Sequence, residues 1–239
     1  MLHPTLRLLR PALAGLLAAG LLAGAWLPDA AAQKKRNTDA KLVLHLVPEG
    51  SSKRLSCFSH GVEGFEDVVT HGALTTPDGE PAGYLAYVLV GDFETDVGVT
   101  AIQFGIAYDP REDSGVDVEG WQDCALLEFH AEDWPEAGSG NLLTWNQVND
   151  CQTEVPVVVG FFHIRVHGSD QFKLIPRPVD NKAVIVGCGL SPGNFAELQV
   201  DLKLENLGHA GFGESTGYNP WNPDENILDI RSRFRPIKD

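Results

Sequence analysis

The sequence predicts an all-β protein, an antiparallel β-sandwich with a short helix near its C-terminal end. Nine or ten short runs alternate apolar and polar residues or are apolar throughout, and Gly and Pro separate them. β-Branched and aromatic residues are frequent in these runs. No stretch between residues 40 and 190 has a helical period. A closed barrel is the alternative that the same pattern allows.

The first 32 residues have the features of a cleavable signal peptide. Arg7 and Arg10 precede an Ala- and Leu-rich run from Ala12 to Leu27, and small residues continue to Ala32. The run is shorter than the ~20 apolar residues of a membrane anchor. We therefore expect a secreted or periplasmic protein without an integral membrane segment after cleavage, beginning with a flexible stretch over 33–39.

The charge of the chain excludes several partner classes. Asp and Glu number 33 against 18 Lys and Arg, a net charge of −15. Nucleic-acid binding requires clustered basic residues, so this chemistry is excluded. Adsorption to anionic lipid is disfavoured for the same reason.

The strands are expected in the sandwich domain, residues 40–207. They fall within 40–50, 84–94, 96–110, 114–121, 124–129, 141–146, 154–168, 171–179, 182–189 and 195–208. A long polar connection separates the first two. Because they are close in sequence, 84–94 and 96–110 are expected to pair as neighbours, and so are 171–179 and 182–189.

The clearest strand is "TAIQFGIAYDP", which begins at Thr100. Alternate side chains of a strand point to opposite faces. The face expected to lie in the core consists of Ile102, Phe104, Ile106 and Tyr108. The other face is flat and small, and could lie against another surface, including an extra strand of this chain: Ala101, Gln103, Gly105 and Ala107.

A turn-rich extension is expected over 208–239. Within it, Ile227, Ile230 and Phe234 have helical spacing, and Asp224 precedes them as a capping residue. The segment 226–234 is therefore a short amphipathic helix or, alternatively, part of a disordered tail.

The four cysteines predict two disulfides, because their number is even and the chain is exported. They are Cys57, Cys124, Cys151 and Cys188, and no two have the C-x-x-C spacing of a metal or redox site. We expect the pairs Cys124–Cys151 and Cys57–Cys188, the first closing a loop of moderate length.

No catalytic motif is present, which predicts a protein that is not an enzyme. The sequence lacks G-x-S-x-G, and oxidised cysteines supply no thiolate. His163 and His167 would lie ~13 Å apart on a strand, too far for one metal ion. No cofactor is expected, although Asp109, Asp113 and Asp117 are candidate ligands of a loose calcium site. A solvated acidic loop is the alternative for these carboxylates.

Two loop tryptophans, Trp134 and Trp221, are candidate ligand-binding residues because neighbouring prolines keep them in loops. An exposed indole can stack on a sugar or anchor a protein. Trp121 and Trp145 are expected to end strands and pack at the rim of the sandwich.

The runs "GVTAIQFGIAYDP", "DWPEAGSGNLLTWN" and "FKLIPRPVDNKAVIVGCG" resemble a group of exported bacterial proteins of unassigned function. In addition, "AIQFGIAYDP" is similar to the opening strands of cohesin-like and related Ig-like sandwich modules. This resemblance implies an adhesive or scaffold role. The expected function is therefore to bind or present a protein or cell-surface partner, and a carbohydrate-binding or carbohydrate-active protein is the alternative.

Overall fold

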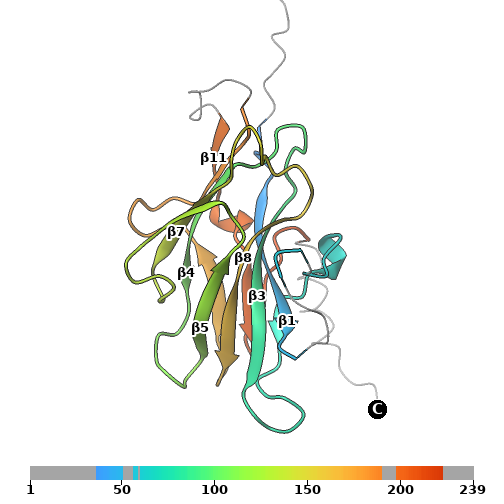
Figure 1. Cartoon of the computed structure of the whole chain (residues 1–239). Coiled ribbons are helices and arrows are strands. Elements are labelled where there is room, and N and C mark those ends of the chain that lie inside the picture. Colours follow the sequence, from blue (N-terminus) through green and yellow to red (C-terminus); the bar gives the residue numbers. More distant parts are fainter. Residues whose placement is uncertain (1–35, 51–55, 59, 190–197, 223–239) are drawn as a thin grey trace, which may run out of the picture. The chain divides into compact units, whose positions relative to one another are not determined.

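The structure is a computed structural model that describes residues 36–50, 56–58, 60–189 and 198–222. Two sheets, antiparallel except for the short β2–β12 pair, pack as a sandwich, which confirms the predicted fold class (Figure 1). The described residues contain no helix with the length and apolar character needed to span a bilayer. The predicted signal peptide and the predicted helix over 226–234 lie outside the described residues.

The first sheet has four strands in the order β1-β3-β8-β5. Their bounds are β1 Lys41–Pro48, β3 Ala82–Gly91, β8 Val157–Val166 and β5 Val116–Asp123. All ten residues of β3 are buried, because β3 is central and both of its faces are covered. We call it the four-stranded sheet.

The second sheet has eight strands and is centred on β4 Ala101–Ala107. Its other strands are β2 His71–Gly72, β6 Leu127–His130, β7 Gly140–Thr144, β9 Gln171–Ile175, β10 Val184–Val186, β11 Gln199–Asp201 and β12 His209–Phe212. Two short 3-10 helices lie outside the sheets, η1 Phe65–Asp67 and η2 Leu204–Asn206. We call this second sheet the larger sheet.

Strands β9 and β10 both pair with the same edge of β4. Gly105 is opposite Gly140 of β7 and also opposite Ile175 of β9, so these two strands must lie on opposite edges. β10 pairs with the 101–103 part of β4, where β7 occupies the other edge. β9 and β10 therefore form one interrupted line, and the residues between them leave the sheet.

The core lies between the two sheets, and the inward face of β4 is as predicted. Ile102, Phe104 and Ile106 have no exposed surface, and Tyr108 packs against the same cluster while partly buried. Across the gap, Phe162 of β8 contacts Phe172 of β9 at 5.0 Å between ring centroids. Burial of these side chains on both sheets is the main stabilising contribution of the fold.

The chain itself covers the outer face of the four-stranded sheet. Val62 and Val68 pack on Leu85 and Tyr87 of β3 in a second apolar cluster, and Trp221 joins it from the C-terminal side. The disulfide Cys57–Cys124 ties this covering segment to the residue that follows β5. This face of the sandwich is therefore filled from within the protein.

The expected neighbour pairs of strands are wrong. β3 and β4 follow each other closely but lie in different sheets, since the turn at 92–100 carries the chain across the core. The runs 171–179 and 182–189 form no hairpin ladder, because β9 and β10 both add to β4; they meet in one isolated antiparallel bridge, Arg177–Lys182. Local alternation defines a strand and its faces, whereas the choice of neighbour depends on the whole fold.

The two predicted disulfides exist, but the expected pairing is wrong. The pairs are Cys57–Cys124 and Cys151–Cys188. β6 and β7 carry the chain away from Cys124 before it reaches Cys151, so closeness in sequence does not bring these two together. Each disulfide instead joins two segments that lie next to the same sheet.

The sandwich extends beyond its expected limits. β12 pairs with β9 and β2, so the predicted C-terminal extension from residue 208 begins inside the larger sheet. At the other end, Asn37 is almost fully buried and its amide donates to Gly98 O at 2.7 Å. Asn37 is thus fixed within the stretch that was expected to be flexible.

Candidate functional site

The outer face of the larger sheet carries a groove over β4, the strand singled out from the sequence. Directly opposite residues of antiparallel strands share a face, so the register defines two rows across five strands. The first row is Gln199, Val186, Ala101, Thr144 and Leu127. The second row is Asp201, Val184, Gln103, Leu142 and Phe129. Five of these ten side chains are aliphatic, namely Val186, Ala101, Leu127, Val184 and Leu142, and Phe129 is aromatic.

One end of the groove is closed by the segment that interrupts the β9–β10 line. This segment, residues 176–182, crosses the sheet at Gly105 and Gly140, which face each other without side chains. We call it the strap. Only glycine permits this contact, because a Cβ on Gly105 would lie 3.0 Å from Pro178 Cδ and 2.8 Å from Ser139 O.

Gln103 anchors the strap to the groove floor. Its Nε2 donates to Asp180 Oδ1 and Oδ2 at 3.0 and 2.9 Å and to Lys182 O at 3.2 Å. Arg177 donates to its Oε1 at 3.4 Å. Both ends of the amide are therefore engaged inside the protein, so Gln103 holds the site together rather than offering a free group.

The other end of the groove is closed by the loop after β7. Gln147 Nε2 donates to Gly189 O, and Thr100 Oγ1 donates to Trp145 O at 3.0 Å. The disulfide Cys151–Cys188 joins the same two segments. This end is therefore fixed by a covalent link and hydrogen bonds.

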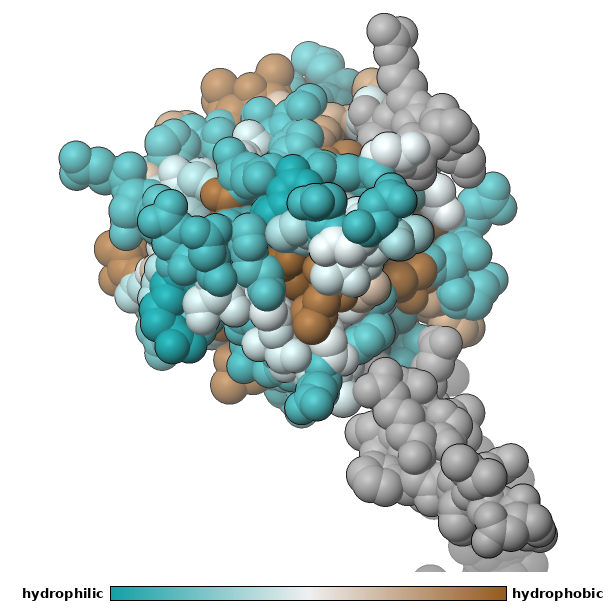
Figure 2. Space-filling view, turned by 90° about the horizontal axis from the view of Figure 1, so that it is seen from below, coloured by the Kyte–Doolittle hydropathy of each residue, from teal (hydrophilic) through white to brown (hydrophobic). Residues whose placement is uncertain are grey.

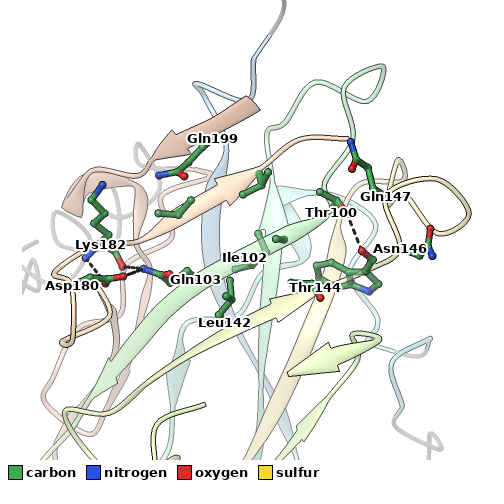
Figure 3. Close-up of a pocket in the computed structure, with 14 residues that line it drawn as sticks. Thr100, Ile102, Gln103, Leu142, Thr144, Asn146, Gln147, Asp180, Lys182 and Gln199 are labelled. Carbon is green, nitrogen blue, oxygen red and sulfur yellow. Dashed lines mark hydrogen bonds between the residues drawn. The ribbon is translucent and has the colours of Figure 1, made fainter. Parts of the chain in front are cut away.

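The space between the two ends has a volume of about 840 Å³. Figure 3 shows Asp180, Lys182 and Gln103 at one side and Thr144, Asn146 and Gln147 at the other, with the aliphatic floor between them. A mostly apolar recess with a few polar groups around it is the usual form of a binding site. In this floor Val186 and Leu142 are partly exposed, whereas Ala101 and Val184 are 8% and 6% exposed.

Exposed apolar side chains continue the groove toward β6. Leu127 and Phe129 are each 54% exposed and lie in the two rows of the floor, and Leu126 just before them is 59% exposed. Val148 and Val179, also exposed, are next in sequence to groove residues. Grouped exposed apolar residues mark an interaction surface more reliably than scattered ones.

The two tryptophans predicted as ligand-binding residues are packed into the protein. Trp134 contacts Phe104 and Trp121 edge to face, at 5.8 and 5.5 Å between ring centroids. Trp221 lies over Gly91 and meets Phe65 edge to face at 6.4 Å. Trp121 and Trp145 also pack against the core, and Trp145 donates to Cys124 O at 3.2 Å. None of these four tryptophans presents an exposed ring face on which a ligand could stack.

The three candidate calcium ligands do not come together as one set. Asp109 is paired with Arg111, whereas Asp113 and Asp117 lie with His167, all three ligand atoms within 4.8 Å of one another. His167 Nε2 is 3.3 Å from Asp117 Oδ2. Calcium prefers oxygen ligands, so the imidazole fits this ion poorly.

The acidic β4–β5 loop lies at the lower end of the sandwich in Figure 1, far along β4 from the groove. Seen from below, this end shows mostly hydrophilic residues with small apolar patches between them (Figure 2). It has the character of an ordinary solvated surface, in contrast to the aliphatic floor of the groove.

A buried histidine lies under the cover of the four-stranded sheet. His45 of β1 accepts a hydrogen bond from Val69 N at 3.0 Å and lies near Tyr87. Burial, together with the smaller effect of the nearby His60, lowers the pKa of His45 from 6.5 to about 4. His45 is therefore neutral in the folded protein and serves as a structural acceptor.

Solved structures with a similar fold are cohesin modules. One is the cohesin module of a family 33 glycoside hydrolase from Clostridium perfringens, at 10% identity and a TM-score of 0.40, covering 72% of this chain and 98% of that one. Another is a type I cohesin from Clostridium thermocellum, solved in a cohesin–dockerin complex, at 8% identity and a TM-score of 0.38, covering 72% and 95%.

A third is the seventh ScaB type I cohesin from Pseudobacteroides cellulosolvens, at 10% identity and a TM-score of 0.34, covering 61% of this chain and 88% of that one. The cohesin-like resemblance expected from "AIQFGIAYDP" is thus found as a similarity of fold. No protein-family model matches the sequence, and no curated protein does.

The alternation of β4 predicts the floor of the groove but does not place its two ends. The small outer face of β4 was expected to meet another surface, and one end of it does meet the strap. The signal for the strap was present as "PRP", since prolines at 176 and 178 cannot continue a paired strand. The contribution of β6 could not be read locally, because it depends on the register with β7.

Proposed function

We propose that this chain is an exported, non-catalytic protein-binding module whose groove over β4 receives apolar side chains of a protein partner. The observation that carries the proposal is a recess of about 840 Å³ whose floor is formed by Ala101, Val184, Val186 and Leu142, with Val186 and Leu142 partly exposed. On the outer face of the other sheet, by contrast, Val62, Val68 and Trp221 pack over the side chains of β3.

The chemistry of the floor favours a protein over a sugar. Sugar sites use the flat face of an exposed aromatic ring, whereas Trp145, which lines the recess, is 6% exposed, and the exposed Phe129 lies on β6 outside the recess lining. Protein interfaces combine an apolar centre with a polar rim. Around this floor, Asn146, Lys182 and Gln199 supply such a rim.

Two features support action outside the cytoplasm. The described cysteines are all in disulfides, which persist in oxidising compartments. Residues 1–32 have the composition of a signal peptide and, on this proposal, are removed during export. The mature chain then begins near residue 33 and is secreted or periplasmic.

The proposal is tested by capture from the extracellular and envelope fractions of the native host. The bait is the exported chain, either unchanged or with Thr144→Arg or Val186→Arg, which place a charge in the groove. Leu204→Arg is the matched control, because Leu204 is a 71% exposed aliphatic residue outside the groove lining. Thermal unfolding of each bait verifies that it is folded.

The expected result is a protein recovered by the unchanged and Leu204→Arg baits and lost with both groove variants. Excess unchanged chain should compete for it, and excess Val186→Arg chain should not. Recovery of the same partner by folded groove variants would contradict the proposal. Binding of glycans from a panel, in place of any protein, would favour the carbohydrate alternative.

A further inference from the structure

Strand β6 is an edge strand of the larger sheet, and it lacks some of the residues that commonly prevent such edges from pairing. In the described part of the chain it pairs with β7 alone. Leu127 and Phe129 are each 54% exposed on it, and it contains neither Lys nor Pro. Edge strands are normally protected by such residues, because unpaired backbone groups can bind another strand.

The register with β7 determines which backbone groups of β6 point outward. Ala131 N donates to Gly140 O at 2.9 Å, in line with the register that places Phe129 opposite Leu142. Groups that point to the same neighbour recur at every second residue. Those of Glu128 and His130 therefore point away from β7, toward the open edge.

We infer that two copies of this chain pair through β6, antiparallel across a two-fold axis, with Phe129 opposite Phe129 of the second copy. In this register Glu128 is opposite His130 of the second copy, and His130 is opposite its Glu128. The outward backbone groups of both residues then bind each other in the narrow pairs of an antiparallel ladder.

This register is favoured over its neighbour by charge and by side-chain packing. A shift that places Leu127 opposite Phe129 would bring Glu128 against Glu128, and like charges directly opposite each other are destabilising. The symmetric register replaces that contact with a carboxylate facing an imidazole. It also joins two phenylalanines on the outer face, where aromatic cross-strand pairs are favourable.

The existing contacts of Glu128 leave it suited to this position. Its Oε1 accepts from Trp121 Nε1 at 2.7 Å and from Asn141 Nδ2, which hold the side chain on the inner face of the sheet. His130 Nδ1 lies 2.8 Å from the O atom of Ala131, the residue that follows β6. Both side chains are thus oriented before pairing, which lowers the entropy lost on association.

Pairing through β6 goes beyond the proposed function and does not depend on it. The second copy adds to the edge of the sheet, whereas a partner in the groove lies on its face. The two rows of each copy would meet at the two-fold axis. The two grooves would therefore open on the same side of the dimer.

The register is tested by cysteine cross-linking of the purified exported chain at 0.15 M salt. Opposite residues that are not hydrogen-bonded have Cα atoms about 4.5 Å apart, within the disulfide range of about 4.4–6.8 Å. Phe129→Cys should therefore form a covalent dimer on mild oxidation. Leu127→Cys should not, because the two copies of residue 127 lie ~13 Å apart in this register.

Sedimentation equilibrium provides a second test without new cysteines. The unchanged chain should reach twice the monomer mass, and Phe129→Lys should raise the dimer dissociation constant at least tenfold. Leu204→Lys is the matched control and should leave it unchanged. The inference would be overturned if the unchanged chain were monomeric, or if residue 127 cross-linked and residue 129 did not. It would also be overturned if the β6 amides were protected from hydrogen exchange only when a different protein is added.

Discussion

Gly105 of β4 and Gly140 of β7 lie opposite each other, and the strap crosses both at the point where neither has a side chain. A Cβ on Gly140 would lie 2.6 Å from Arg177 Cγ, and one on Gly105 would lie 3.1 Å from Pro176 O. This close approach ends the groove and positions Asp180 to bind Gln103. The pair of glycines therefore links the local geometry of the sheet to the shape of the candidate site.

Gly105→Ala should destabilise the protein by about 1–3 kcal/mol, since the new methyl group meets backbone atoms that must move. Gly120→Ala in β5 is the matched control, because a Cβ there has nothing within 4 Å. Its effect should stay within about 0.5 kcal/mol. Urea unfolding of both variants measures the difference, and equal stabilities would show that the strap does not constrain Gly105.

Glu128→Ala should lower stability by about 1–3 kcal/mol, because Trp121 Nε1 and the buried Asn141 Nδ2 lose their shared acceptor. Glu128→Gln keeps an acceptor oxygen and should recover most of the loss. Trp121 belongs to the opposite sheet, so its fluorescence should also change in the alanine variant. Identical unfolding curves for the two variants would contradict this role of the carboxylate.

Stability should fall as the pH drops from about 6.5 to about 4, in part because of His45. Its pKa is lowered from 6.5 to about 4 by burial, so within this window the unfolded chain binds a proton that the native chain does not. The difference amounts to at most about 3 kcal/mol and stops growing below the folded pKa.

His45→Asn is the variant that isolates this effect, because its amide oxygen can still accept from Val69 N. His60 and Asp67 also face His45 and remain in the variant. Urea unfolding between pH 4 and 7 should show a shallower pH dependence for His45→Asn than for the unchanged chain. Parallel curves would mean that His45 does not titrate differently on folding.

Peptide mapping without reduction should recover Cys57 linked to Cys124 and Cys151 linked to Cys188. These bridges span 67 and 37 residues, for which chain entropy predicts stabilisation of about 4 kcal/mol each. Removal of Cys151 and Cys188 together should also loosen one end of the groove. A peptide joining Cys124 to Cys151 would contradict the structure.

Particular residues show how far the sequence could predict this protein. Ile102, Phe104 and Ile106 were assigned to the core from alternation alone, since a half-buried strand must place every second side chain inward. The same pattern said nothing about the neighbours of β4. The strands that pair with β4 depend on where the chain crosses from one sheet to the other. That crossing determines that β10, and not β3, is a neighbour of β4.

The candidate site likewise has features that local sequence predicts and features that depend on the whole fold. The flat outer face of Ala101 and Gln103 could be predicted, but its closure by Asp180 could not, because 77 residues separate Gln103 from it. Trp134 was selected for its proline-flanked loop, yet Phe104 and Trp121 provide a pocket that buries it. Composition describes a loop, whereas burial depends on the surface that the loop packs against.

The central claim is that the groove over β4 is the protein-binding surface, and photocross-linking tests it most directly. A photoreactive phenylalanine at Thr144 lies in the groove, and one at Leu204 lies outside it. With the native envelope and extracellular fractions, Thr144 should cross-link to one protein, and excess unchanged chain should suppress the product. Equal cross-linking at both positions, or none at Thr144, would contradict the claim.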